Sequence, residues 1–145
     1  MMIDKANQPS GRLIIDVFKN GEVIEHFDEP NLIVLNSKLI QSQLLGGNSG
    51  YAISQIGFGT NGTAPVAGNT GLTGSYLKHI DYVSYPASNS VLFGFSLGST
   101  ENNGVSISEF GLFTVNGKLF ARRVRSTPLA KTSDISLSAS WIISF

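Results

Sequence analysis

Gly57, Gly59 and Gly62 in the segment QIGFGTNGTAP have the spacing G-x-G-x-x-G after a strand-like stretch, and Asp81 follows later. This pattern is typical of a dinucleotide site, where a pyrophosphate lies at a helix N-terminus and an acid binds the ribose. Such a site needs a helix that begins at the third glycine. The continuation TAPVAGNTGLTG cannot form a helix of useful length, because it is rich in glycine and contains proline. We therefore interpret these glycines as structural: they let the chain leave a strand and turn where a Cβ would clash.

The other residues that could do chemistry are few. His26 and His79 are the only histidines, and they lack the H-x-x-x-H or H-E-x-x-H spacing of a metal site. The chain has no G-x-S-x-G motif and no cysteine, so both histidines are expected to be partly solvated strand residues. Asp16 and Glu25 could stand opposite each other across a hairpin and resemble the carboxylate pair of a glycosidase. Two acids on a solvent-exposed face of the hairpin are the better interpretation. We predict no catalytic residue, no metal and no cofactor.

Arg122, Arg123 and Arg125 form the only basic cluster, and Glu109 lies inside the apolar stretch SISEFGLF. A buried carboxylate needs a partner, so we expect an arginine of the facing strand to pair with Glu109, a solvated Glu109 being the alternative. The chain has ten basic and ten acidic residues, and charged residues make up only 14%. Without a long-range field we expect no nucleic-acid or membrane partner, and weak repulsion between copies favours association.

Two hairpins are predicted around the dipeptides Asn20-Gly21 and Asn116-Gly117, since this pair readily adopts the positive φ of a tight turn. In-register pairing across the second turn would place Phe113 opposite Phe120. Further strands are expected at about 51–58, 76–85 and 90–98 from their apolar and β-branched residues.

One short helix, at about 36–45, is predicted to lie on a sheet and to stop at two glycines. The apolar residues at helical spacing are Leu32, Leu35, Leu39, Ile40 and Leu44. Residues 59–75 contain five glycines and no periodicity, so they form a long loop. Loops longer than about 12–15 residues tend to be functional or to be held by a partner.

The final segment, DISLSASWIISF, alternates between apolar and serine residues, which predicts a strand with one buried face. The residues on the apolar side are Ile135, Leu137, Ala139, Trp141, Ile143 and Phe145. We expect Phe145 to plug the edge of the core. A membrane barrel is disfavoured, because residues 1–12 lack the apolar region of a signal peptide and residues 36–47 read as helical. No apolar run approaches the roughly 20 residues of a membrane-spanning helix.

These patterns predict one domain, residues 1–145, with a mainly antiparallel β-sandwich of seven or eight strands and one short helix. Four pieces in order carry a resemblance: NLIV before the helix, AISQIGFGTNGTAP with NTGLT, then NNGVSISEFGLFTVNGKLFARR, and finally KTSDISLSASWIISF. This succession resembles small structural proteins of tailed bacteriophages, of the tail, tail-fibre or minor virion type. The motif residues are Gly57, Phe58, Gly59, Thr60, Pro65, Glu109, Gly111, Phe113, Gly117, Phe120, Arg122, Trp141 and Phe145.

The resemblance covers about residues 30–145 and implies a virion component without catalytic residues, made in the cytoplasm of an infected bacterium. We expect it to oligomerise and to dock other virion proteins, through the 59–75 loop and the sheet edges, in the tail, baseplate or fibre-attachment region. A capsid decoration or head-fibre protein is one alternative. The other is a carbohydrate- or receptor-binding module for a host glycan, built from Tyr76, Tyr82, Tyr85 and Asp81. Tyr76 and Asp81, however, have opposite strand parity.

Overall fold

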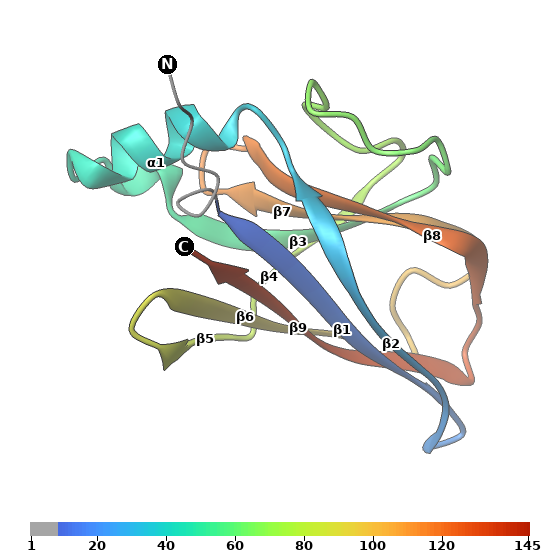
Figure 1. The fold of residues 1–145 in the computed structure, drawn as a ribbon. Coiled ribbons are helices and arrows are strands. Elements are labelled where there is room, and N and C mark those ends of the chain that lie inside the picture. The colour runs from blue at the N-terminus through green and yellow to red at the C-terminus, as the bar shows by residue number, and fades with distance from the viewer. Residues whose placement is uncertain (1–8) are drawn as a thin grey trace.

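A computed structural model describes residues 9–145 (Figure 1). The expectation that residues 1–12 hold no signal peptide therefore falls mostly outside the described residues. The elements in chain order are β1 (Ser10–Lys19), β2 (Glu22–Ile33), α1 (Ser37–Leu45), the short 3-10 helix η2 (Ser49–Tyr51), β3 (Ile53–Gly59), β4 (Tyr76–His79), β5 (Tyr82–Ala87), β6 (Ser90–Leu97), β7 (Val105–Thr114), β8 (Leu119–Lys131) and β9 (Ile135–Ser144).

The nine strands form one curled antiparallel sheet in the order β4-β3-β7-β8-β2-β1-β9-β6-β5, which folds into two facing layers (Figure 1). Strand β2 belongs to both layers. Most of it pairs with β1, and its last residues, Leu32 and Ile33, pair with Arg122 and Ala121 of β8. The predicted mainly β, sandwich-like fold with one short α-helix is confirmed.

The described part of the chain has nine strands where seven or eight were expected, and one reason is that the strand expected at about 76–85 is two strands, β4 and β5. The break lies at Ile80 and Asp81. The Ile80 amide donates to Ser54 of β3, whereas the Asp81 amide donates to Gly94 of β6. Consecutive amides thus bond to different layers, and the chain crosses from one layer to the other at this point. The two ends of the curled sheet, β4 and β5, are therefore neighbours in sequence.

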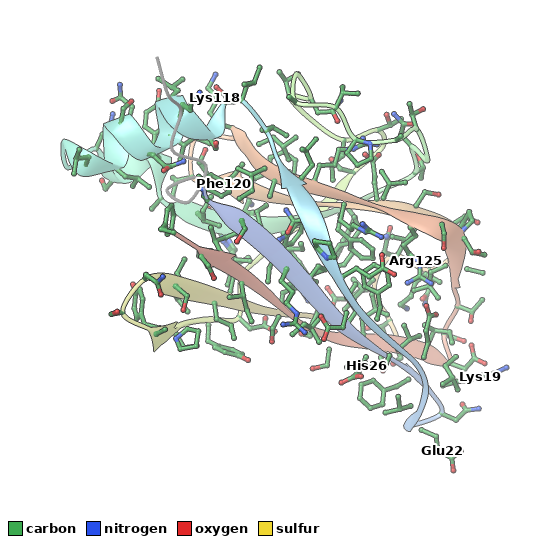
Figure 2. The ribbon with its side chains drawn as sticks, viewed as in Figure 1. Lys19, Glu22, His26, Lys118, Phe120 and Arg125 are labelled. Atoms are coloured by element: carbon green, nitrogen blue, oxygen red, sulfur yellow. The ribbon has the colours of Figure 1, made fainter. Side chains whose placement is uncertain are left out.

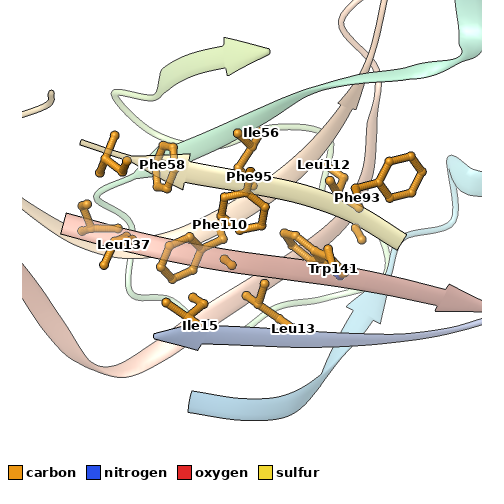
Figure 3. Packing of buried hydrophobic residues seen from close by; sticks show 14 of the residues in the cluster. Leu13, Ile15, Ile56, Phe58, Phe93, Phe95, Phe110, Leu112, Leu137 and Trp141 are labelled. Carbon is orange, nitrogen blue, oxygen red and sulfur yellow. The ribbon is translucent and has the colours of Figure 1, made fainter. Parts of the chain in front are cut away.

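The core lies between the two layers, where apolar residues from β1, β6 and β9 meet those from β3 and β7 (Figure 3). Phe58 is fully buried in this core, packed edge-on against Phe95 and Phe110 at centroid distances of 6.0 and 5.8 Å. Trp141 is fully buried, and its indole nitrogen donates to Asn31 at 2.7 Å, so its one polar group is satisfied. The alternation predicted for β9 is confirmed from Ile135 to Ile143.

The first hairpin turns at Asn20-Gly21 as predicted, with φ values of 51° and 82°. A β-bulge directly after Val17 then shifts the ladder by one residue. Asp16 consequently stands opposite His26, and Glu25 stands opposite Val17. Asp16 and Glu25, considered as a possible opposed pair, do not face each other, because the extra residue moves Glu25 to the other face of the sheet.

The second hairpin also forms where predicted, but its loop is one residue longer than a two-residue turn. The Gly117 amide donates to the Thr114 carbonyl at 3.0 Å, and Gly117 has a φ of 83°. A turn of this kind ends in a glycine bulge. Phe113 therefore faces Leu119, and the predicted Phe113–Phe120 pair is wrong. Figure 2 shows Phe120 at the start of β8, where it is buried in the main core.

The helix forms where predicted, but its apolar side is not covered by a sheet. Ile40 is fully buried, whereas Leu35, Leu39 and Leu44 are each at least 40% exposed. The reason is its position: α1 lies at one end of the two layers and contacts mainly η2 and β8 (Figure 1). Phe145 also departs from expectation. Strand β9 ends at Ser144, and the Phe145 side chain is 48% exposed instead of plugging the core.

Candidate functional site

The segment between β3 and β4 is anchored by a buried ion pair. Arg122 of β8 donates from Nε to Oε1 of Glu109 on β7 at 2.8 Å, and both side chains are almost wholly buried. The predicted pairing of Glu109 with an arginine of the facing strand is confirmed. Adjacent strands β7 and β8 bring the two charges together, and each side chain then has further hydrogen-bonding groups to satisfy.

Those remaining groups bind the loop. Oε2 of Glu109 accepts hydrogen bonds from the backbone amides of Asn61 and Thr73, both at 2.9 Å. The Arg122 guanidinium donates to the carbonyls of Asn61 and Thr63 and to the side-chain oxygen of Asn69. The loop is thus held near both ends and in its middle by two side chains. These hydrogen bonds restrain its backbone within the single chain.

Two motif glycines make room for this anchor. A Cβ on Gly59 would lie 2.5 Å from the Glu109 carboxylate, and a Cβ on Gly57 would lie 2.8 Å from the Phe113 ring. Both glycines lie within β3 and neither has a positive φ. Gly62, in the loop, has only Ser108 within 4 Å of its Cβ position. The interpretation that these glycines are structural is confirmed at Gly57 and Gly59, where a Cβ would clash with neighbouring side chains. None of the three glycines forms a turn with a positive φ.

A small apolar cluster lies beneath the same loop, on the outer face of the β3–β7–β8 layer. Phe113, Leu119 and Val34 are buried there, and Leu72 of the loop packs on them. A Cβ on Gly111 would meet Leu119 at 2.9 Å. Phe113 has this role because of the glycine bulge that moved it away from Phe120. The loop is therefore held both by hydrogen bonds to Glu109 and Arg122 and by the apolar contact of Leu72.

A second loop, between β6 and β7, folds around another buried charge. The Lys131 ammonium donates to Asn103 at 2.7 Å and to the carbonyls of Thr132 and Ser99 at 3.1 and 3.4 Å. Burial lowers the pKa of Lys131. In the same loop, Glu101 binds the Lys78 ammonium at 2.8 Å. Lys78, together with the Gly98 amide, lowers the pKa of Glu101 to about 2. Sequence reasoning missed this arrangement, because Lys78 and Lys131 are more than twenty residues away in the chain from the loop residues that they bind.

The arginine cluster does not form a basic patch. Arg122 binds Glu109, Arg123 forms an ion pair with Glu29, and Arg125 binds Glu25 at 2.8 Å. Arg123 and Arg125 also lie over the Phe27 ring, at 5.2 and 5.9 Å from its centroid. Each positive charge is thus matched by a carboxylate. Figure 2 shows Arg125 above the β1–β2 hairpin end, where Lys19, Glu22 and His26 lie.

Of the residues considered for catalysis, only His26 and Asp16 meet, on an exposed part of the first hairpin. His26 is exposed, and its Nδ1 lies 2.6 Å from the Asp16 carboxylate, while exposed His79 lies on β4. Within residues 9–145, no group of three or more His, Asp or Glu side chains is placed to hold a metal ion. Of the residues considered for a glycan site, Tyr82 and Tyr85 share β5 next to Asp81, but Tyr76 lies in the other layer. Tyr76 donates to Glu101 in one layer, and Tyr82 lies over Gly94 in the other.

Exposed apolar residues and charged residues are unevenly distributed along the chain. Nine of the thirteen exposed large apolar side chains of the described residues lie between positions 35 and 85. From 39 to 100, the only residues of the Asp, Glu, Lys, Arg and His types are Lys78, His79 and Asp81. Leu35 and Leu39 also line an open cleft between α1 and loop residues 67–70. A surface that is apolar and nearly uncharged favours contact with other proteins.

Comparison of the chain with protein-family models, with curated proteins and with solved structures finds no match. Among the described residues, no helix combines the length and apolar character needed to cross a membrane.

Proposed function

We propose that this protein is a non-catalytic structural component of a tailed-bacteriophage virion, which oligomerises and docks other virion proteins in the tail, baseplate or fibre-attachment region. Two observations support this: most of the exposed large apolar side chains lie in a stretch of chain with few charged residues, and the long loop beside them is hydrogen-bonded to the sheet by Glu109 and Arg122. A loop restrained in this way loses little conformational entropy when a partner binds, which favours a specific contact.

The resemblance adds a second line of support. Gly59, Glu109 and Arg122, which are among its motif residues, meet in the ion-pair anchor, and Gly57, Gly111 and Phe113 meet beside it. A motif scattered over sixty residues of chain thus serves one local purpose, which is to hold the 60–75 loop. This is what an assembly protein with a preformed docking loop requires.

Mass spectrometry of purified particles tests the proposal. We expect the protein in virions at a fixed copy number relative to the major capsid protein, and retained after a wash with molar salt. A non-structural protein of the same infection serves as the control and should be lost. Absence of the chain from washed particles would contradict the proposal, and a cryo-EM map would distinguish a tail position from the alternative of a capsid decoration or head fibre.

A further inference from the structure

The curled sheet has two free edges, and they are protected differently. Strand β4 spans only Tyr76–His79, and its Lys78 is held by Glu101. Strand β5 spans Tyr82–Ala87, and all six of its residues are exposed. It pairs with β6 on one side, and among the described residues no strand pairs with its other side. A free strand edge exposes unpaired backbone groups that can bind another strand.

The β5 edge carries none of the charges that usually protect such a strand. Residues 82–100 contain no Asp, Glu, Lys, Arg or His. Val83 is 47% exposed and Tyr85 is 76% exposed. Phe145 lies at the same place, because its backbone exchanges hydrogen bonds with Asn89 in the β5–β6 turn. The edge is therefore apolar and uncharged along its length.

Pro86 restricts where another strand can bind. Proline has no amide hydrogen, and the pairing of β5 with β6 is irregular between Ser84 and Ala87. A new strand can therefore form regular hydrogen bonds only along residues 82–85. Tyr82 is fixed there, since its ring covers Gly94. The contact is short, so its affinity in isolation is modest.

We propose that residues 82–85 of β5 pair antiparallel with the same edge of a second copy of this chain. Such a two-fold contact places Tyr82 opposite Tyr85 and Val83 opposite Ser84 of the second copy, so both edges bring the same residues to the contact and a net charge on one edge would meet the same charge on the other. The absence of charge in residues 82–100 removes that repulsion. A partner that relies on ion pairs would find none on this edge. This inference rests on the proposed function and names the surface through which copies meet.

Sedimentation velocity over a concentration series tests this inference with the full chain. The double variant Tyr85→Lys/Ala87→Lys places charges on two exposed positions of the edge. We expect the wild-type protein to dimerise and the variant to have a dissociation constant at least about tenfold higher. Val23→Lys/Ile24→Lys, on exposed positions of β2 at the other end of the molecule, is the matched control and should dimerise like the wild-type protein.

Hydrogen exchange provides a readout that needs no variant. The amides of residues 82–85 should become more protected as the wild-type concentration rises, whereas those of β4 should not. A wild-type monomer at all concentrations, or a dimer unaffected by the lysines on β5, would overturn the inference. Virion mass spectrometry of the same variants separates the two proposals. If the protein is found in virions but does not dimerise through β5, only this inference is contradicted. If it dimerises through β5 but is absent from virions, only the proposed function is contradicted.

Discussion

Arg122 connects three segments of the chain through one side chain. It binds Glu109 in the sheet and the backbone of residues 61 and 63 in the loop. A buried charge is costly unless its partner and its hydrogen bonds are all present. The same residue therefore stabilises the sheet and determines the loop conformation, so its loss should affect both.

We predict that Arg122→Met lowers the free energy of unfolding by about 3–5 kcal/mol, because it leaves the buried Glu109 carboxylate unpaired. Urea denaturation followed by tryptophan fluorescence measures the change, since Trp141 is the only tryptophan. Arg12→Met is the control: it removes an exposed ion pair with Asp28 and should change stability little. Equal stability of the two variants would contradict the proposed anchor.

A second prediction concerns Gly59. Gly59→Ala places a Cβ against the Glu109 carboxylate and should cost about 1–3 kcal/mol of stability through overpacking. Gly68→Ala, in the loop, is the matched control, because nothing lies within 4 Å of its Cβ position. Thermal unfolding of both variants measures the difference. If Gly59→Ala and Gly68→Ala had the same unfolding temperature, the predicted crowding of the Glu109 carboxylate by the new Cβ would be contradicted.

At the scale of elements, turns and loops determine which residues meet. The bulge after Val17 and the glycine bulge at Gly117 each shift a hairpin register by one residue. Loop 98–104 brings Glu101 against Lys78 of β4 and helps to enclose Lys131. The elements are thus joined by charges in connecting segments as well as by the apolar core.

The ion pair between Glu101 and Lys78 predicts that stability depends on pH. Because the pKa of Glu101 is lowered to about 2 in the folded protein, its contribution to stability is complete above its ordinary value of 4.5. That contribution is lost as the pH falls from 4.5 towards 2. We expect Glu101→Gln to be less stable than the wild-type protein at neutral pH, and the difference to shrink across this window. Urea denaturation at a series of pH values measures it, and a constant difference would contradict the prediction.

At the scale of the whole molecule, the uncharged β5 edge and the charged β1–β2 turn lie at different ends. Lys19, Glu22 and His26 lie at the β1–β2 turn, while the β5–β6 turn, α1 and the C-terminus lie at the opposite end (Figures 1 and 2). The ten basic and ten acidic residues balance, so copies do not repel one another at long range. Association through the uncharged edge is compatible with this distribution.

Salt provides the corresponding test. A contact without charges is not screened, so the dimer dissociation constant should change less than about twofold between about 0.05 M and about 0.5 M NaCl. Sodium sulfate should tighten the dimer, because it strengthens apolar burial. Sedimentation velocity in each salt measures both effects. A dimer that weakens tenfold or more in NaCl would instead place the contact at the charged hairpin end.

Local patterns in the sequence determined much of this fold. Alternation predicted β9 and its buried residues, the Asn-Gly dipeptides predicted both hairpins, and the isolated acid in SISEFGLF predicted the Glu109–arginine pair. These features depend on neighbouring residues and on the cost of burying a charge, so a short stretch of sequence is enough to predict them.

Only the tertiary structure decided the rest. A bulge of one residue moved Glu25 and Phe113 away from their expected partners, and the position of α1 at the end of the layers left its leucines exposed. The anchoring of the 60–75 loop by Arg122 and the free edge of β5 depend on contacts between segments far apart in the chain. Such contacts are set by how the layers pack, and strand periodicity carries no information about them.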